Sequence, residues 1–181
     1  TMVICEKTLE QVVIPDSVTS IGDYAFDGCT GLTSITIPDS VTTIGNSAFS
    51  SCKGLTSVTI GNSVTTIGEC AFSYCDGLTS VTIPDSVTTI GDSAFISCNS
   101  LTGIWVDAEN PAYCSDAYGV LYNKDKSVLV CIPGGVTGNY TVPEGVVIVG
   151  EDAICNSQKL TGITFPSTLN AIEEYSFINC S

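Results

Sequence analysis

Cysteine has the clearest spacing for chemistry in this chain of 181 residues. Four cysteines recur at intervals of 23 residues and a fifth holds the equivalent place near the C-terminus: Cys29, Cys52, Cys75, Cys98 and Cys180. A zinc site needs thiolates that converge on one ion, whereas side chains repeated at a fixed period run parallel and lie one repeat apart. Parallel Cβ vectors also fail the geometry of a disulfide. We therefore expect the first four to be reduced, buried and used as small hydrophobic residues.

Two further cysteines, Cys114 and Cys131, fall outside this register. They lie in a segment where the repeat is interrupted, so the argument from parallel side chains does not reach them. A disulfide between these two stays open, and it is the one bridge that we consider.

Acidic residues recur at the turn of each repeat. Asp16, Asp39 and Asp85 hold equivalent positions, with Asn62 in register between them. Calcium takes about six to eight oxygen ligands, and one carboxylate per repeat falls short of that number. We therefore assign these residues to turn formation rather than to a calcium ladder.

Catalytic chemistry is poorly provided for. A carboxylate pair for glycoside hydrolysis could be drawn from Asp107, Glu109 or Asp116, but any acidic protein offers such pairs and nothing in the sequence indicates a cleft. Histidine is absent, which excludes Ser-His-Asp and Cys-His pairs and every His-ligated metal site. We expect no enzyme, no metal and no cofactor.

Composition bounds the class of partner. Nineteen acidic residues stand against five lysines and no arginine, for a net charge of -14. Nucleic acid and anionic membrane surfaces are poor partners for such a chain, because both require basic groups. The chain is too apolar for disorder, at 44% hydrophobic residues, yet its longest apolar run, residues 128–132, is far too short to insert into a membrane.

An internal repeat organises the whole chain. A first copy covers residues 9–31, and the unit returns over 32–54, 55–77 and 78–100, each of 23 residues. A longer unit of 36 residues covers 101–136, and weaker copies cover 137–159 and 160–181. We therefore expect one domain of about seven units over residues 9–181, preceded at residues 1–8 by the remnant of another unit or a cap.

Each unit predicts a strand, a turn and a short helix. In the second unit, apolar residues alternate with Ser34 and Thr36, the period of a half-buried strand, and Pro38 ends it. After a return leg at residues 41–44, Asn46 is a plausible cap for one or two helical turns. No unit can bury its apolar face alone, so the units must stack. We expect parallel strands at 34–37, 57–60 and 80–83 in one curved sheet, and a core stack of Phe26, Phe49, Phe72 and Phe95.

The repeat resembles a known family. Leu-x-x-Ile-x-Ile looks like the opening of a leucine-rich repeat, and with Pro-Asp-Ser-Val and Thr-Thr-Ile-Gly-x-x-Ala-Phe-x-x-Cys it is similar to the BspA-like leucine-rich-repeat family of bacterial and protozoan surface proteins. The resemblance covers nearly all of residues 9–181. It implies an extra hairpin within 107–135, where the longer unit departs from the period. The fold expected is an α/β repeat solenoid: a right-handed superhelix with a parallel sheet on one face and short helices on the other.

The resemblance also implies surface display and adhesion to host or microbial proteins. No signal peptide opens this sequence, so a surface or secreted location implies that such a segment is removed or lies outside it.

The outward face of the sheet is where binding could reside. Its outward positions are mostly small hydroxyls, and the one large aromatic is Trp105, the single tryptophan of the chain. The other outward positions without a hydroxyl are Gln11, Val13, Gly103 and Gly162. A large amphipathic ring on the face that solenoids use for binding has the character of a contact hot spot. The alternative, which is compatible with this one, is that the indole packs against Tyr113, Tyr118 or Tyr122. The predicted ligand contacts are Trp105, Tyr113, Tyr118, Ser34, Thr36, Ser57, Thr59, Ser80 and Thr82.

Two functions therefore follow from the sequence. The first is a non-catalytic protein-recognition or adhesion module on a cell surface. The second is a structural spacer in a larger surface protein, with no ligand of its own. An exposed, non-repetitive aromatic site around Trp105 would favour the first, and a surface uniform along its length would favour the second.

Overall fold

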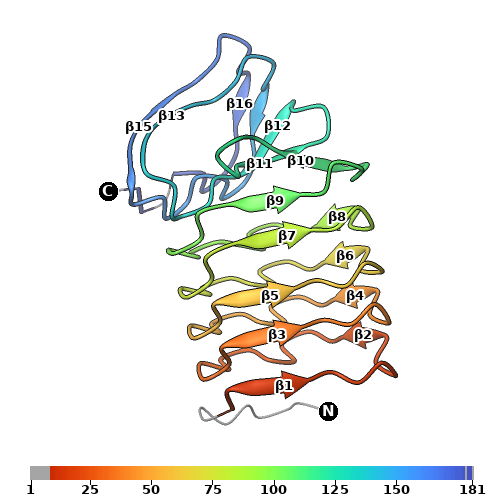
Figure 1. Cartoon of the computed structure of the whole chain (residues 1–181). Helices are drawn as coiled ribbons and strands as arrows, with labels where there is room; N and C mark the ends of the chain where they lie inside the picture. Colours follow the sequence, from red (N-terminus) through yellow and green to blue (C-terminus); the bar gives the residue numbers. More distant parts are fainter. Residues whose placement is uncertain (1–8, 178, 181) are drawn as a thin grey trace.

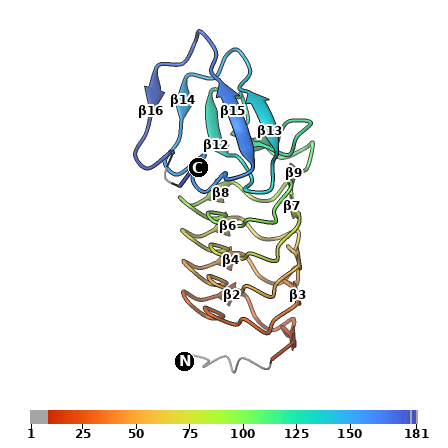
Figure 2. The ribbon, with the colours of Figure 1, turned by 90° about the vertical axis from the view of Figure 1, so that its left-hand side faces the viewer.

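The computed structural model describes residues 9–177, 179 and 180, so the predicted remnant or cap at residues 1–8 lies outside the described residues. The described chain winds as a solenoid, and each coil lays short strands beside those of the coil before it (Figure 1). These strands form two separate faces along the stack (Figure 2).

The first face carries the strands predicted from alternating apolar and hydroxyl residues. They are parallel, and partners such as Ser34 and Ser57 are one 23-residue period apart. The three predicted strands are confirmed to within a residue, but not as one continuous sheet, because β5 and β7 meet through an isolated bridge between Ser57 and Ser80. The strands of this face in the first five coils are β1 (Gln11–Val13), β3 (Ser34–Thr36), β5 (Ser57–Thr59), β7 (Val81–Ile83) and β9 (Ile104–Val106).

A second parallel sheet runs along the return leg, where the sequence predicted no strand. It consists of β2 (Ser20–Ile21), β4 (Thr43–Ile44), β6 (Thr66–Ile67) and β8 (Thr89–Ile90). Each strand is a single pair of residues, of which the isoleucine is the more buried. The same 23-residue register joins Thr43 to Thr66 and Thr66 to Thr89.

The expected helices are absent from the described residues, so the prediction of an α/β solenoid is wrong on this side. In a helix, each amide bonds to a carbonyl four residues earlier in its own segment. Here alternate amides bond to the next coil, as Ser47 does to Glu69 and Phe49 to Ala71. Ser47 and Ser51 also have φ of 51° and 58°, in the left-handed region that a right-handed helix excludes.

The described part of the chain also contains no helix long and apolar enough to cross a bilayer.

The core of the solenoid is built from residues that stack coil on coil. Phe26, Phe49, Phe72 and Phe95 lie nearly parallel, with successive ring centroids 5.0, 5.2 and 5.6 Å apart. The predicted phenylalanine stack is therefore confirmed.

The longer unit contributes three antiparallel strands: β10 (Tyr113–Ser115), β11 (Leu121–Asn123) and β12 (Val128–Cys131). β12 then pairs in parallel with β14 (Ile148–Val149), which pairs with β16 (Ala171–Ile172). A separate two-stranded sheet joins β13 (Gly138–Thr141) to β15 (Leu160–Thr164). The insertion therefore starts one of the two faces of the C-terminal coils.

Strand β11 separates two hydrophobic cores. Leu121 packs into the core of the N-terminal coils, whereas Val120 and Tyr122 pack into that of the C-terminal coils. All three side chains are fully buried. Beyond this strand the stack changes direction, and the C-terminal strands run steeply across those below them (Figure 1).

Candidate functional site

The hydroxyl residues predicted as ligand contacts lie exposed on the first face: Ser34, Thr36, Ser57, Thr59, Ser80 and Thr82. Within the described chain none of these six side chains makes a hydrogen bond. Neighbouring threonines do: Thr56 Oγ1 donates to the carbonyl of Thr33 at 3.0 Å, and Thr102 Oγ1 to that of Thr79 at 3.0 Å. The outward hydroxyls are thus available to a partner, while their neighbours tie the coils together. Contact of the six with a ligand stays a prediction.

Trp105 interrupts this hydroxyl face. It is the register partner of Thr82 and is 43% exposed, in agreement with its predicted outward position. The indole lies across Gly103, since a Cβ at that position would come within 2.8 Å of two ring carbons. Gly103 was also assigned outward but is buried. The missing side chain is therefore what lets the indole lie close to the backbone.

Trp105 shares a shallow hollow of about 420 Å³ with residues from two other segments. Tyr118 comes from the loop between β10 and β11, and Val136 and Thr137 come from the segment before β13. None of the lining residues is charged. We call this site the aromatic hollow, and its residues are Thr102, Trp105, Ala117, Tyr118, Gly135, Val136 and Thr137.

Asp116 holds the Tyr118 loop in place. Its Oδ1 accepts hydrogen bonds from the main-chain amides of Tyr118 and Val120 at 2.8 and 3.0 Å, and its Oδ2 accepts one from the Tyr140 hydroxyl. The ring of Tyr140 in turn meets Tyr118 edge to face, with centroids 5.8 Å apart. Burial and the neighbouring Asp116 carboxylate raise the pKa of Tyr140. Asp116, a candidate for a catalytic pair in the sequence, is therefore engaged in positioning Tyr118.

The other tyrosines of the insertion lie away from the hollow. The Tyr113 hydroxyl accepts a hydrogen bond from the amide of Ile90 at 2.9 Å, and this side chain is half-buried. Tyr122 is fully buried and is hydrogen-bonded to Tyr140. Of the three tyrosines considered as partners of Trp105, Tyr118 is thus the one that the fold brings to the same hollow.

The cysteine ladder is buried, as predicted, at Cys52, Cys75 and Cys98, and all three are free thiols. Each thiol donates to the carbonyl of a phenylalanine 26 residues earlier, over 3.1 to 3.2 Å. Burial raises the pKa of Cys52 to about 12.

Cys29 is disulfide-bonded, so the prediction of a reduced thiol is wrong at this position. The geometric argument holds for Cys52, Cys75 and Cys98, which remain free thiols. Cys114 and Cys131, the pair left open, are free thiols.

The acidic residues singled out in the sequence support turns. Asp39 Oδ1 accepts the amide of Asn62 at 2.7 Å, which links equivalent turns of neighbouring coils. Asp107 Oδ1 accepts the amide of Glu109 at 2.9 Å within its own turn. In the described part of the chain, no group of three or more Cys, Asp or Glu side chains is placed to hold a metal ion.

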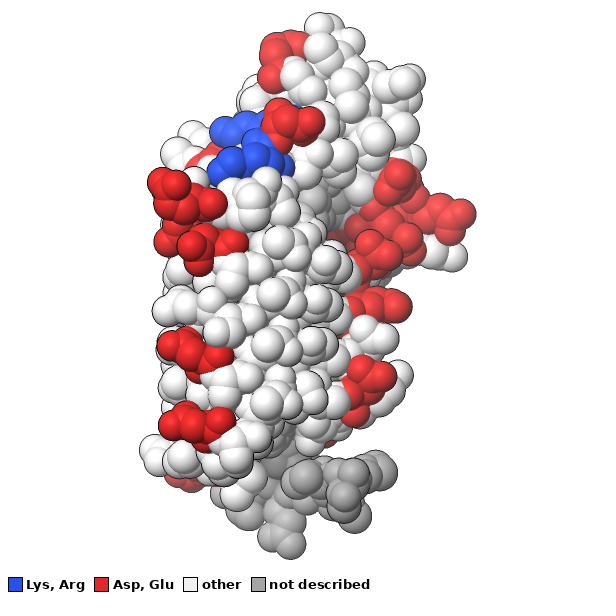
Figure 3. Space-filling model, turned by 90° about the vertical axis from the view of Figure 1, so that its right-hand side faces the viewer, with Lys and Arg blue, Asp and Glu red and all other residues white. Residues whose placement is uncertain are grey.

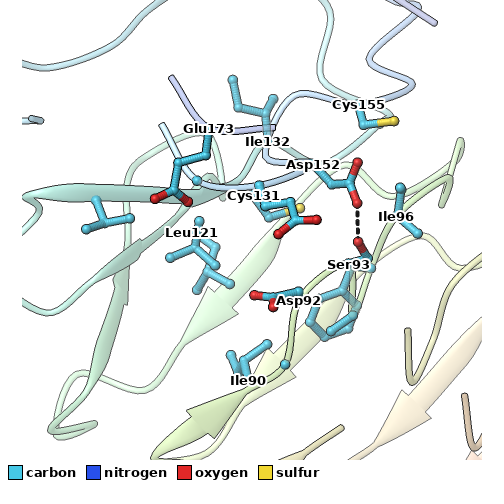
Figure 4. Close-up of a pocket in the computed structure, with 18 of the residues that line it drawn as sticks. Ile90, Asp92, Ser93, Ile96, Leu121, Cys131, Ile132, Asp152, Cys155 and Glu173 are labelled. Atoms are coloured by element: carbon cyan, nitrogen blue, oxygen red, sulfur yellow. Dashed lines mark hydrogen bonds between the residues drawn. The ribbon is translucent and has the colours of Figure 1, made fainter. Parts of the chain in front are cut away.

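A second cavity, of about 200 Å³, lies where the N-terminal and C-terminal stacks meet (Figure 4). Its walls are partly apolar, and it carries the carboxylates Asp92, Glu151, Asp152 and Glu173. On the face drawn in Figure 3, acidic side chains lie along both edges and form their largest cluster on the right-hand edge. Partial desolvation and the neighbouring Asp92 and Asp152 carboxylates raise the pKa of Glu151. No local pattern in the sequence predicts this cavity, because it joins residues as far apart as Ser93 and Asp152, which are hydrogen-bonded.

Residues 4–118 and 137–181 match the family model of the BspA type leucine-rich repeat region, in six copies. The unmatched segment between them coincides with most of the insertion. No curated protein matches the chain.

Solved structures of bacterial leucine-rich repeat proteins resemble the chain. A leucine-rich cell surface protein from Faecalibacterium prausnitzii is 30% identical, with a TM-score of 0.77 over 90% of this chain and 49% of that one. A leucine-rich repeat protein from Eubacterium ventriosum is 30% identical, with a TM-score of 0.72 over 85% of this chain and 47% of that one. The pneumococcal vaccine antigen PcpA is 30% identical, with a TM-score of 0.73 over 84% of this chain and 44% of that one. The chain thus spans about half the length of these proteins.

Proposed function

The chain belongs to the BspA-type leucine-rich repeat family, and from this premise we propose that it is a non-catalytic protein-recognition module of a cell-surface or secreted protein. The stacked coils bury the repeated apolar residues in the core, and the first face stays exposed to a partner along its length. Surface display is supported by the similarity to a protein named as a leucine-rich cell surface protein and to a pneumococcal vaccine antigen.

The observation that carries the proposal is the aromatic hollow. Elsewhere on this face the outward residues are mainly small hydroxyls, which offer little apolar area for a hot spot. At the hollow, two large amphipathic rings, those of Trp105 and Tyr118, lie together and remain 43% and 64% exposed. Aromatic residues of this kind dominate the binding energy of protein interfaces. The hollow is also where the repeat is interrupted, so it distinguishes this chain from a uniform spacer.

The partner that we propose is a host or microbial surface protein of neutral or basic character. The net charge of -14 repels acidic proteins and nucleic acid at long range. No charged side chain lines the hollow itself. Charge would thus raise the rate at which the partner associates, and the aromatic contacts would lower the rate at which it dissociates.

The experiment is capture of extracellular-matrix and microbial surface proteins on the immobilised domain. The parent is compared with Trp105→Ala and with Tyr24→Ala, since Tyr24 is 62% exposed but lies in the first coil. We expect at least one protein to be retained by the parent and by Tyr24→Ala and to be lost by Trp105→Ala. Retention of no protein by any of the three domains would favour the spacer function, whereas retention of the same proteins by all three would place the binding site outside the hollow.

A further inference from the structure

The aromatic hollow supplies hydrogen-bond donors, and its side-chain acceptors are hydroxyl oxygens rather than carboxylates or amides. Within the described residues, neither the indole N–H of Trp105 nor the hydroxyl of Tyr118 has an intramolecular partner. The carboxylate of Asp116, beside Ala117 in the chain, already accepts three hydrogen bonds from protein groups. A ligand that fits this site should therefore present acceptors and should need no carboxylate or amide acceptor in return.

The hollow is also uncharged, in a chain with a net charge of -14. A lysine or arginine side chain placed there would find no carboxylate lining the hollow, and an acidic side chain would meet the repulsion of the whole molecule. The lining is instead two aromatic rings, the methyl groups of Val136 and Ala117, and the backbone of Gly135. This electrostatic character fits a neutral, partly apolar ligand.

A proline-rich segment has this combination of properties. Proline has no backbone N–H, so it needs no acceptor from the site, and its carbonyl groups remain free in the polyproline II conformation because that helix has no internal hydrogen bonds. Its ring packs on aromatic faces, and aromatic-lined grooves are the recurring solution for recognising such segments. The segment is already extended before binding, so the shallow hollow does not have to offset a large loss of conformational entropy.

A neutral sugar is the competing ligand for an exposed aromatic ring. Each sugar hydroxyl both donates and accepts, so a sugar site must supply acceptors as well as donors. Here the side-chain acceptors that line the hollow are the hydroxyl oxygens of Thr102, Tyr118 and Thr137. No Asn, Gln, Asp or Glu side chain lines the hollow. The available chemistry therefore favours the peptide.

We propose that the aromatic hollow binds a proline-rich segment of the partner protein in the polyproline II conformation, with a proline ring against Trp105 and peptide carbonyls accepting hydrogen bonds from Trp105 Nε1 and the Tyr118 hydroxyl. The inference rests on the proposed recognition function and names the class of sequence that the site takes. The hydroxyl positions of the adjoining first face, such as Thr82, would lie beside the continuing peptide.

The fluorescence of Trp105 tests this directly, because it is the one tryptophan of the chain. The domain is titrated with a polyproline peptide of about ten residues, with a glycine-serine peptide of equal length and with a cello-oligosaccharide. We expect a saturable change in emission with polyproline and none with the other two. A saturable change with the oligosaccharide alone would overturn the proposal in favour of a sugar, and no change with any probe would overturn it outright.

Calorimetry on variants of Tyr118 distinguishes the contribution of its aromatic ring to binding from that of its hydroxyl. Tyr118→Ala should weaken polyproline binding at least about tenfold, and Tyr118→Phe, which keeps the ring, by about two- to tenfold, the usual effect of one hydrogen bond. Tyr24→Ala, with a similarly exposed tyrosine in the first coil, should bind like the parent. Equal losses in Tyr24→Ala and Tyr118→Ala, or full affinity in Tyr118→Phe, would contradict the assigned contacts.

The outcome is distinguishable from failure of the proposed function. Capture of a surface protein that depends on Trp105, together with no polyproline binding, would leave recognition intact and refute the proline-rich class. Polyproline binding that survives Trp105→Ala would place the peptide elsewhere and also refute it.

Discussion

The ladder cysteines combine two roles that alanine or serine could fill only one at a time. Their sulfur atoms pack in a core with no exposed surface, and their S–H groups bond to carbonyls of the preceding coil. The carbonyls of Phe26 and Phe49 also accept main-chain amides, so each of these S–H groups adds a second hydrogen bond to a carbonyl that already has one.

Burial predicts the reactivity of these thiols. Alkylation of the folded protein at neutral pH should leave Cys52, Cys75 and Cys98 unmodified, and alkylation in denaturant without reductant should label all three, while Cys29 should require reductant. Peptide mass mapping provides the measurement. Native labelling of Cys75 would mean that the core opens far more readily than its packing implies.

The raised pKa of Cys52 also gives a pH dependence. Its folded value is about 12 against an ordinary 9.0, so the folded state disfavours the thiolate. Below pH 9 this contribution to stability is fully present, and it is lost as pH rises from about 9 towards 12, because the unfolded chain then gains the thiolate. Denaturant titrations of the parent and of Cys52→Ala should converge over that range. A constant difference between the two curves would contradict the assignment.

Phe72 tests the inside and outside of the repeat. It is fully buried between Phe49 and Phe95, so Phe72→Ala should lower the free energy of unfolding by about 3–5 kcal/mol. Ser57→Ala, on the exposed face of β5, should change it by less than about 0.5 kcal/mol. Similar losses in a urea titration would refute the orientation of the strands.

At the scale of the element, the missing helix has a local cause. The segment from Asn46 to Cys52 has apolar residues at helical spacing, but two of its residues adopt positive φ and its alternate amides pair with the next coil. Coils stacked at a fixed interval place amides and carbonyls of neighbouring coils within hydrogen-bonding distance. These hydrogen bonds between coils use the same backbone groups that a helix would pair within its own segment. Periodicity within a single unit could not reveal that competition.

Ser51→Gly provides a test of this backbone. Ser51 has a φ of 58°, where glycine avoids the strain of a side chain, so the substitution should raise the free energy of unfolding by about 0.5–1 kcal/mol. Ser50→Gly, one residue earlier and without a positive φ, should lower it by a similar amount. If Ser51→Gly and Ser50→Gly both stabilised the protein, relief of strain at a positive φ would not be the cause, because Ser50 has no positive φ.

The sequence predicted well the features that show apolar alternation or a repeated large side chain, and poorly the backbone pairing that neither pattern marks. The strands around Ile35 and the phenylalanine stack follow from an unbroken period, and the exposure of Trp105 follows from alternation in β9. The second sheet was missed because two residues per coil carry no recognisable alternation. Tyr118 was named as a contact, but its meeting with Val136 depends on the insertion and the following coil, whose arrangement no local pattern encodes.

At the scale of the whole molecule, the insertion both bends the stack and builds the site. Strand β11 contributes side chains to two cores, and the loop before it supplies Tyr118, one of the two rings of the aromatic hollow. Replacing the insertion with a regular coil would therefore remove the site and disturb both cores together. Single substitutions in the hollow separate these effects.

The charge of the molecule predicts how association responds to salt. With a net charge of -14, the chain attracts basic partners at long range, and salt screens this attraction over a Debye length of about 8–10 Å. The association rate with a basic partner should fall as ionic strength rises, while the dissociation rate, set by contacts in the uncharged hollow, should change little. Surface plasmon resonance at several salt concentrations gives both rates. A salt effect confined to dissociation would place charged groups in the contact itself.

Recognition through the aromatic hollow is the central claim, and the affinity of a captured partner tests it most directly. Calorimetry should compare the parent, Trp105→Ala and Tyr24→Ala, with circular dichroism to verify that all three are folded. We predict that Trp105→Ala loses at least about 2 kcal/mol of binding free energy and that Tyr24→Ala loses none. Equal affinity of the parent and Trp105→Ala would contradict the account, because the binding site would then lie outside the hollow.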